Sequence, residues 1–160
     1  MYQDVITTYE VTAKQIPSQQ VAAVWMHTSM ATIGDDIALG FARLTSAIEI
    51  SGAKLAGPLF LVFHGRIDDE TGGDIELCGP VLAPFNRCAD VYGAKIPGGR
   101  MASTVHRGSY DDVGPAYAAI LAWMDDHGLR PAGPPREYYL NDAETTKQED
   151  LLTEITFPVR

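Results

Sequence analysis

The run Arg136-Glu137-Tyr138-Tyr139 places an acid among aromatic residues in a segment with the composition of a short β-strand. Because side chains alternate along a strand, Glu137 and Tyr139 share one face, while Arg136, Tyr138 and Leu140 share the other. A buried carboxylate can offset the charge of a bound cation or transfer a proton, and it is costly when nothing compensates it. Glu137 is therefore the first candidate for a functional residue, with Tyr139 beside it.

The sequence contains two similar copies of one unit, and the position that holds Glu137 in the second copy is apolar in the first. Residues 35–58 align without a gap on residues 111–134, and both segments end in Ala-Gly-Pro. Continuing the alignment, Leu61 and Phe63 stand where the second copy has its glutamate and tyrosine. The first copy therefore uses as core a position that the second copy gives to an acid.

Two interpretations of the acid stay open from the sequence alone. In the first, the second sheet is shifted, so that Glu137 is solvated or paired with Arg136 or Arg107. In the second, Glu137 is buried and retained to meet a cation or to move a proton. A cation about 4 Å away would gain roughly 4 kcal/mol at an effective dielectric constant of about 20.

The two copies predict a single α+β domain over residues 1–160. The copies span about 9–82 and 88–160, and each has a β-β-α-β-β pattern. We expect a tandem duplication of a β-α-β-β unit, with two antiparallel sheets and one helix each around a central groove. Each helix covers one face of its sheet, so the groove is expected between the helix-free faces, and a ligand at the seam of the halves.

The strands at residues 9–15 and 89–95 precede Ile-Pro turns. Each is expected to form a hairpin with the strand that follows its turn. Each half would then be a self-contained sheet.

One amphipathic helix is predicted in each half. The apolar stripes are Ile37, Phe41, Leu44 and Ile48 in the first copy and Val113, Tyr117, Ile120 and Met124 in the second. The Asp pairs at 35–36 and 111–112 are expected to cap the helix N-termini. Gly52 and Gly128 are expected to end the helices in the left-handed conformation.

Four further side chains are candidates for the walls of the groove. Leu61 and Phe63 qualify as counterparts of the glutamate and tyrosine in the second copy. Trp25 lies in the strand before the first helix, where core packing and ligand stacking are equally compatible with the sequence. Tyr110 opens the second helix, where capping and packing are favoured and contact with the groove is the alternative.

No metal or cofactor site is indicated by the sequence. His27 and His106 lie near strand ends without a partner at metal-ligand spacing, and a structural or exposed role is favoured for both. Cys78 and Cys88 show neither metal spacing nor a disulfide framework, which favours two free thiols. The Gly-Gly pairs have the composition of turns rather than phosphate loops.

Composition excludes several classes of function. The formal net charge is −9, from 21 acidic and 12 basic residues, and no basic run occurs. Nucleic-acid binding needs clustered Lys and Arg, so direct binding to DNA or RNA is not expected. No apolar stretch reaches about 18 residues and the N-terminus "MYQDVITTYEV" shows no signal-peptide pattern, so no membrane association is predicted and the cytoplasm is the default location.

Several motifs carry a resemblance to a known family. They are "VHRGSY" at 105–110, "WMDDHGL" at 123–129, "REYYL" at 136–140 and the closing "FPV" at 157–159. Together they resemble the GyrI-like small-molecule-binding domain, also described as the effector-binding domain of AraC- and MerR-type regulators. The resemblance is strong from residue 96 onward and weaker over the first half.

The resemblance implies a duplicated β-α-β-β fold around a central groove that binds amphipathic, often cationic, aromatic compounds. It also implies that the glutamate of an E-x-Y strand lies at the bottom of the groove, which here corresponds to Glu137 with Tyr139. Regulators of the family carry a DNA-binding domain ahead of this one, and eight residues before the first predicted strand leave no room for it. The chain therefore resembles the stand-alone members, which include a gyrase-modulating protein, drug-binding proteins and hydrolases of reactive xenobiotics or toxins.

Three functions follow as hypotheses. The leading one is a receptor that binds an amphipathic organic cation, with Glu137 as counter-charge and Tyr139, Phe63 and Trp25 as walls. The alternative is a hydrolase in which Glu137 is a general acid or base and Tyr139 or Tyr110 orients a water or leaving group. A third is a surface that binds a protein partner such as gyrase. The sequence indicates neither the ligand nor the oligomeric state.

Overall fold

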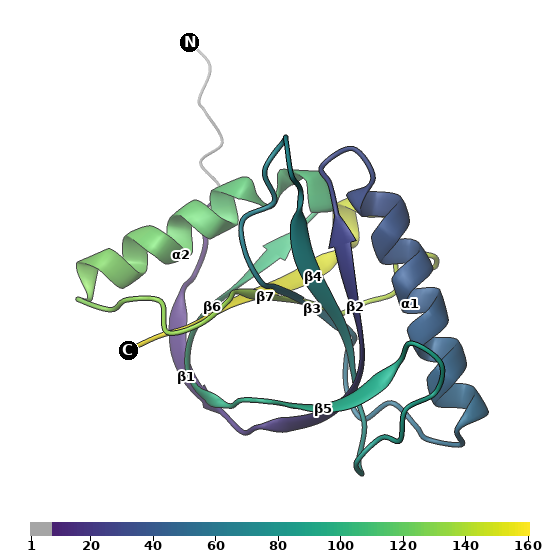
Figure 1. Cartoon of the computed structure of the whole chain (residues 1–160). Helices are drawn as coiled ribbons and strands as arrows, with labels where there is room; N and C mark the ends of the chain where they lie inside the picture. Colours follow the sequence, from purple (N-terminus) through teal and green to yellow (C-terminus); the bar gives the residue numbers. More distant parts are fainter. Residues whose placement is uncertain (1–7) are drawn as a thin grey trace.

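A curled antiparallel sheet forms the framework of the protein, and two helices lie outside it (Figure 1). The computed structural model describes residues 8–160, so most of the N-terminal segment considered for a signal peptide lies outside the described residues. The strands are β1 (Thr12–Ile16), β2 (Gln19–Thr28), β3 (Phe60–Phe63), β4 (Gly73–Pro80), β5 (Tyr92–Ile96), β6 (Gly99–Arg107), β7 (Arg136–Tyr139) and β8 (Leu152–Pro158). Across the sheet their order is β1-β6-β8-β7-β3-β4-β2-β5.

The predicted α+β class, with antiparallel strands and two helices, is confirmed. Helix α1 (Ile33–Ile50) follows β2, and helix α2 (Gly114–Asp126) follows β6. The two predicted sheets are joined into one, because β3 pairs with β7 and places Leu61 opposite Glu137. Within the described residues, no helix is long and apolar enough to cross a membrane.

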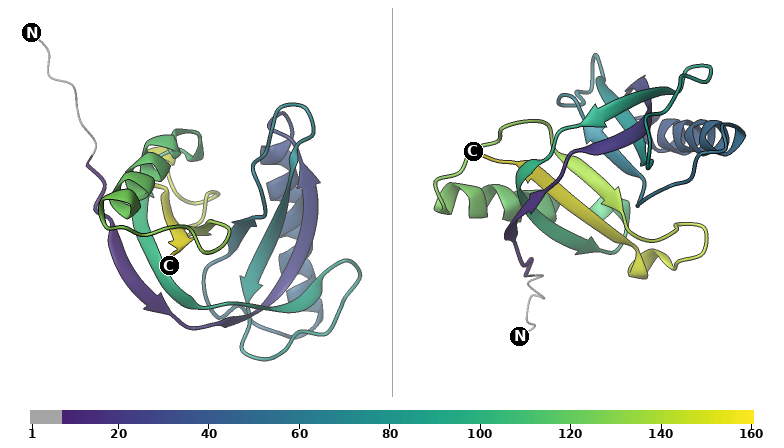
Figure 2. Two further views of the ribbon diagram at one scale, coloured as in Figure 1. Left: turned by 60° about the vertical axis from the view of Figure 1, so that its left-hand side comes forward. Right: turned by 90° about the horizontal axis from the view of Figure 1, so that it is seen from below.

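The outermost strands exchange partners between the halves, which corrects the predicted hairpins. β1 pairs with β6, and β5 pairs with β2, so neither pairs with the strand that follows its Ile-Pro turn. A two-residue hairpin needs a positive φ at its first turn position, which Pro17 and Pro97 cannot adopt. Each segment instead runs on to the other arm of the half-barrel, so that β1–β2 and β5–β6 cross at its base (Figure 2).

Both helices end where the sequence predicts. Gly52 and Gly128 follow the last turns with φ of +73° and +67°, the left-handed conformation that glycine adopts without strain. The predicted stripes face the sheet, and their fully buried members are Leu44, Ile48, Ile120 and Met124.

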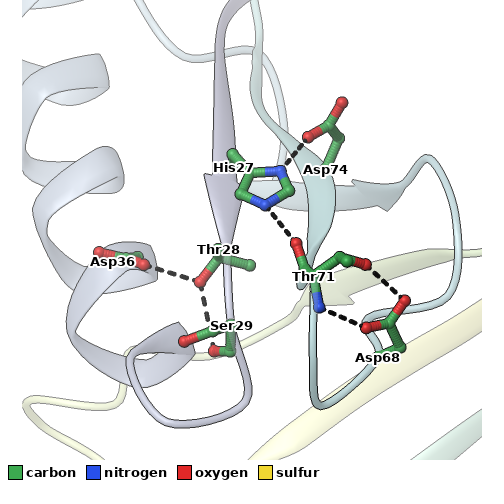
Figure 3. Close-up of polar contacts among 7 residues, drawn as sticks. All are labelled: His27, Thr28, Ser29, Asp36, Asp68, Thr71 and Asp74. Atoms are coloured by element: carbon green, nitrogen blue, oxygen red, sulfur yellow. Dashed lines mark hydrogen bonds and ion pairs between the residues drawn. The ribbon is translucent and has the colours of Figure 1, made fainter.

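The helix N-termini differ from the prediction. Thr32 precedes α1, and the Asp pair lies inside the first turn, where Asp36 accepts hydrogen bonds from the hydroxyls of Thr28 (2.7 Å; Figure 3) and Thr32 (2.9 Å). Before α2 the Asp pair lies in the 3₁₀ helix η1 (Tyr110–Asp112), whose cap is Ser109. The acids suit the positive end of a helix, but the predicted capping of backbone N–H groups by them is wrong.

His27 fastens the β3–β4 loop to the end of β2 (Figure 3). Its Nδ1 donates to Asp74 Oδ1 and its Nε2 to the Thr71 carbonyl oxygen, both at 2.7 Å. The hydrogen bond with Asp74 raises the pKa of His27, because both acceptors require a protonated ring nitrogen. Asp68 accepts from the Thr71 backbone N–H and hydroxyl. This placement agrees with a structural role for His27.

The sheet has two faces with different surroundings. A row on one face contains Val24, Leu77, Leu61, Glu137 and Ile155, and we call it the helix face because α1 and α2 cover it. The adjacent row contains Trp25, Glu76, Val62, Arg136 and Thr156, on the face that lines the half-barrel, which we call the inner face. A one-residue shift in register would exchange the two faces.

The crossing of the two long segments requires glycine at position 98. A Cβ on Gly98 would lie 2.4 Å from both the Ile16 carbonyl oxygen and the Pro17 carbonyl carbon. We expect Gly98→Ala to lower the free energy of unfolding by about 1–3 kcal/mol, as overpacking does, in urea denaturation followed by tryptophan fluorescence. Gly34→Ala is the matched control, because Gly34 lies in the first turn of α1, where a Cβ meets nothing within 4 Å, and it should change the free energy of unfolding by less than about 0.5 kcal/mol. Equal effects of the two substitutions would contradict this account of the crossing.

Candidate functional site

Glu137 lies at the middle of the seam between the two halves. On β7 it stands between Leu61 of β3 and Ile155 of β8. The residue is only 7% exposed, because its side chain projects from the helix face into the space between α1 and α2. The acid is thus on the helix-covered face, and not on the helix-free face where the sequence suggested a groove.

Two tyrosine hydroxyls hold the carboxylate of Glu137. Tyr117 of α2 donates a very short hydrogen bond to Oε2, and Tyr139 of β7 donates to Oε1 at 3.1 Å. No ion pair to Glu137 occurs within residues 8–160. Every donor on the carboxylate is therefore electrically neutral.

The first interpretation of Glu137, a solvated or arginine-paired acid, is wrong. Arg136 projects from the inner face, because consecutive side chains of a strand point to opposite sides. Arg107 forms its ion pair with Asp150 at 2.7 Å. Neither arginine compensates the buried carboxylate.

Burial dominates the protonation of Glu137. Removal from water raises the pKa of the Glu137 carboxyl, and the hydrogen bonds from Tyr117 and Tyr139, together with nearby His106, oppose that shift only in part. Burial and the adjacent carboxylate also raise the pKa of both tyrosine hydroxyls far above the ordinary range. The tyrosines therefore remain protonated donors at any physiological pH.

An aromatic shell surrounds the acid. Tyr110, which opens η1, contacts the Tyr139 ring edge-on at 5.4 Å between centroids, and Phe41 of α1 contacts it from the other helix at 5.8 Å. Tyr139 is packed among these rings, whereas Tyr110 is 37% exposed at the surface. The structure thus brings together Glu137, Tyr139 and Tyr110, with Tyr110 outermost.

Leu61 and Phe63 also lie on the helix face, but differently. Leu61 is fully buried beside Glu137. Phe63, two residues further along β3 on the same face, is partly exposed, and its backbone N–H donates to the Pro135 carbonyl oxygen. Phe63 and Pro135 line a cavity of about 470 Å³ between the β3–β4 loop and the segment that enters β7. The other lining residues are His64, Gly65, Arg66, Gly133 and Pro134.

Trp25 lies on the inner face, away from Glu137, so it is not a wall of this site. Its register partner is Glu76, and its indole stacks on the His64 ring at 4.1 Å. His64 Nε2 in turn donates to Glu76 Oε1 at 2.8 Å, and the Tyr92 hydroxyl donates to Oε2 at 2.6 Å. The 47% exposure of Trp25 shows that it is not a core residue either.

Tyr117 is the site residue that the sequence analysis missed, because its place in a helical apolar stripe suggests packing alone. The alignment of the two copies contained the signal. Phe41 and Phe63 of the first copy correspond to Tyr117 and Tyr139 of the second. The copy that carries Glu137 thus adds a hydroxyl at both aromatic positions, and both hydroxyls bind the carboxylate.

His106 has a structural place beside the site. Its Nε2 donates to the Ser109 carbonyl oxygen at 2.9 Å, and its Nδ1 forms a hydrogen bond with the Tyr9 hydroxyl, also at 2.9 Å. These bonds tie residue 9 to the loop that leads into η1. Within residues 8–160 no group of three His, Cys, Asp or Glu side chains is arranged as a metal-ligand set.

Comparison with known proteins places this geometry in a family. Residues 9–160 match the family described as the GyrI-like small molecule binding domain. The structure resembles the C-terminal domain of EcmrR, with a TM-score of 0.80 and 22% identity over 96% of this chain and 99% of that domain. In the EcmrR–DNA complex the TM-score is 0.87 at 24% identity, over 98% of this chain and 59% of the EcmrR chain, so this chain spans little more than half of that protein.

Two further solved structures share the fold at lower similarity. A hydrolase encoded by lin2189 from Listeria innocua has a TM-score of 0.71 at 15% identity, over 94% of this chain and 92% of that one. SAV2435, solved bound to tetraphenylphosphonium, has a TM-score of 0.60 at 16% identity, over 96% of this chain and 94% of that one.

The raised pKa of Glu137 predicts a pH-dependent stability difference between wild type and Glu137→Gln. The folded state binds the carboxyl proton more tightly than the unfolded state, so this group's contribution falls as pH rises through its folded pKa. Gln is neutral at every pH, and Glu137→Gln should gain stability relative to wild type from pH 4 to pH 8. Urea denaturation of both proteins across that pH range measures the difference between their free energies of unfolding. The contributions of the other titrating groups are common to both proteins and cancel in this difference. A difference independent of pH would contradict the raised pKa.

Proposed function

The chain belongs to the GyrI-like small-molecule-binding domain family, and from this premise we propose that it binds an amphipathic organic cation with Glu137 as the counter-charge. The observation that carries the proposal is a glutamate that is 7% exposed and whose carboxylate, within residues 8–160, accepts hydrogen bonds from two neutral hydroxyls and pairs with no cation. Such a group retains much of its desolvation cost, which a ligand cation would offset.

The electrostatic gain favours cations over neutral molecules of the same shape. A cation about 4 Å from the carboxylate gains roughly 4 kcal/mol at an effective dielectric constant of about 20. The rings of Tyr110 and Tyr139 add cation–π attraction, which contributes about 0.5–2 kcal/mol per favourable contact. Tyr110 is the more exposed ring of the two, so its displacement would open a route from the surface toward the acid.

The apolar part of the ligand would lie against Phe63. The cavity there has a volume of about 470 Å³, within the usual range of about 300–1,000 Å³ for small-molecule sites. Phe63 lines this cavity and lies two residues along β3 from Leu61, the register partner of Glu137. A rigid aromatic cation would fill the cavity with its rings and reach the carboxylate with its charge.

A second candidate function is hydrolysis with Glu137 as general acid. It is favoured by the raised pKa of the carboxyl, which keeps the proton available nearer to neutral pH, and by the tyrosine hydroxyl on each carboxyl oxygen. The likeness of the fold to a Listeria hydrolase supports it as an alternative. Breakdown of the ligand during the binding experiment distinguishes the two functions.

Calorimetric titration with tetraphenylphosphonium, the ligand in the SAV2435 structure, tests the proposal. Wild type should prefer this cation to the neutral triphenylphosphine oxide, and Glu137→Gln should lose the preference, weakening cation binding about tenfold or more. Glu154→Gln is the matched control, because Glu154 lies on the inner face opposite Tyr138 and is not one of the residues that line the cavity at Phe63, and it should bind the cation as wild type does. Equal binding of the cation by wild type and Glu137→Gln would reject the counter-charge role.

Cation affinity should fall as the pH is lowered through the pKa of Glu137. The proton and the ligand compete for one carboxylate, so binding releases a proton in this range and the apparent affinity follows the ionised fraction. Titrations in buffers of different ionisation enthalpy measure the proton release directly. A pH-independent affinity in wild type would contradict the proposal even if tetraphenylphosphonium binds.

A further inference from the structure

The lining of the cavity at Phe63 has two parts with different chemistry. One part is apolar and contains Phe63, Pro134 and Pro135. The two prolines have no backbone N–H, and the Pro135 carbonyl oxygen already accepts from the Phe63 N–H. The other part is the segment His64-Gly65-Arg66, which begins the β3–β4 loop. The side-chain donors of the lining are therefore confined to this second part.

Arg66 brings a positive charge to the cavity lining. The residue is exposed, so a ligand in the cavity can reach its guanidinium without a change in the fold. Within residues 8–160, Arg66 forms no ion pair. Its charge is therefore open to a group on the ligand.

The acids near Arg66 in the chain are directed to other partners. Asp68 accepts from the backbone N–H and the hydroxyl of Thr71, and Asp74 pairs with His27. None of the seven residues that line the cavity is acidic. An anionic group of a ligand would meet a cation there and no carboxylate in the wall.

The loop segment that carries Arg66 is held at both ends. At its start, the His64 ring donates to Glu76 at 2.8 Å and stacks on Trp25 at 4.1 Å. At its end, Thr71 accepts from His27 at 2.7 Å. An anchored backbone loses less conformational entropy when a ligand binds, so the position of Arg66 favours recognition.

Arg66 and Glu137 lie in different directions from Phe63. Toward the acid, Leu61 is the register partner of Glu137 and lies two residues before Phe63, or about 7 Å along the strand. Arg66 follows Phe63 in the chain and lines the cavity. A ligand whose rings lie against Phe63 would thus have the negative group of Glu137 toward one end and the positive group of Arg66 toward the other.

We propose that the natural ligand is zwitterionic, with a carboxylate that binds Arg66 in addition to the cationic centre that meets Glu137. This inference rests on the proposed function and specifies the class of ligand for the same site. A planar carboxylate can accept two parallel N–H bonds from the fork of a guanidinium. A zwitterion would pair both the glutamate and the arginine, whereas a simple cation would pair the glutamate alone.

Calorimetric titration with two matched phosphonium ions tests the proposal, at constant ionic strength. One is para-carboxyphenyl(triphenyl)phosphonium, a zwitterion at neutral pH, and the other is para-tolyl(triphenyl)phosphonium, a cation of similar size without the carboxylate. Wild type should bind the zwitterion about threefold more tightly or better, a modest factor because Arg66 is exposed to solvent. Equal or weaker binding of the zwitterion would overturn the proposal.

Three variants assign the effect. Arg66→Gln should abolish the preference for the zwitterion. Arg100→Gln is the matched control and should keep it, because Arg100 is also exposed, forms no ion pair within residues 8–160 and does not line the cavity. Glu137→Gln should weaken binding of both phosphonium ions and leave their ratio unchanged.

The outcomes separate this inference from the proposed function. Binding of the tolyl cation that depends on Glu137, without a preference for the zwitterion, would overturn the inference alone. A preference that persists in Arg66→Gln would overturn the role of Arg66. If wild type binds neither phosphonium ion, the proposed function and the inference are both rejected.

Discussion

The pairing of β3 with β7 is the constraint on which the candidate site depends. These strands have four residues each, and three register pairs join them, with Leu61 opposite Glu137. A slip of one residue would turn Glu137 to the inner face and bring Arg136 under the helices. Longer strands outside this seam hold the register, because β4 and β8 flank it and the crossing of β1–β2 with β5–β6 ties the two arms together.

Burial of Glu137 in this register has a desolvation cost, and the hydrogen bonds from the neighbouring tyrosines reduce this cost without removing it. Hydroxyl donors from Tyr117 and Tyr139 satisfy one lone pair on each carboxylate oxygen, but neither hydroxyl carries charge. A lysine or arginine at either position would neutralise the acid and leave nothing for a ligand to compensate. Neutral donors therefore keep the carboxylate ordered and, at the same time, electrostatically available.

The sequence predicts those features that depend on local pattern or on comparison of the two copies. Helical periodicity identifies the stripes, and Gly52 and Gly128 mark the helix ends because only the local backbone decides them. The apolar counterpart Leu61 favours a buried position for Glu137, and the structure decides between this interpretation and a solvated acid. The exchange of β1 and β5 cannot be predicted in this way, since it depends on pairing between segments some 80 residues apart in sequence, such as Ile16 with Gly99.

The face on which a strand residue lies is harder to predict than the strand itself. Trp25 is assigned to the inner face by its pairing with Glu76, and a register shift of one residue would have placed it under α1. The role of Tyr117 is not predicted for another reason. The helical pattern accounts for the packing of its ring, but it contains no information on the partner of its hydroxyl. Only the position of Glu137 shows what that hydroxyl does.

Alternation along β7 explains how opposite charges on consecutive residues remain separate. In a strand, Arg136 and Glu137 must point to opposite faces, so they cannot form the ion pair that would neutralise both. The pKa of Glu137 is set by its burial and by the neighbouring residues Tyr117, Tyr139 and His106. Arg136 does not contribute to it. A single four-residue strand can therefore present a negative group to the space between the helices and a positive group to the interior of the half-barrel. The carboxylate of Glu137 remains without an opposite charge on the helix face, which is the condition under which it can select a cationic ligand.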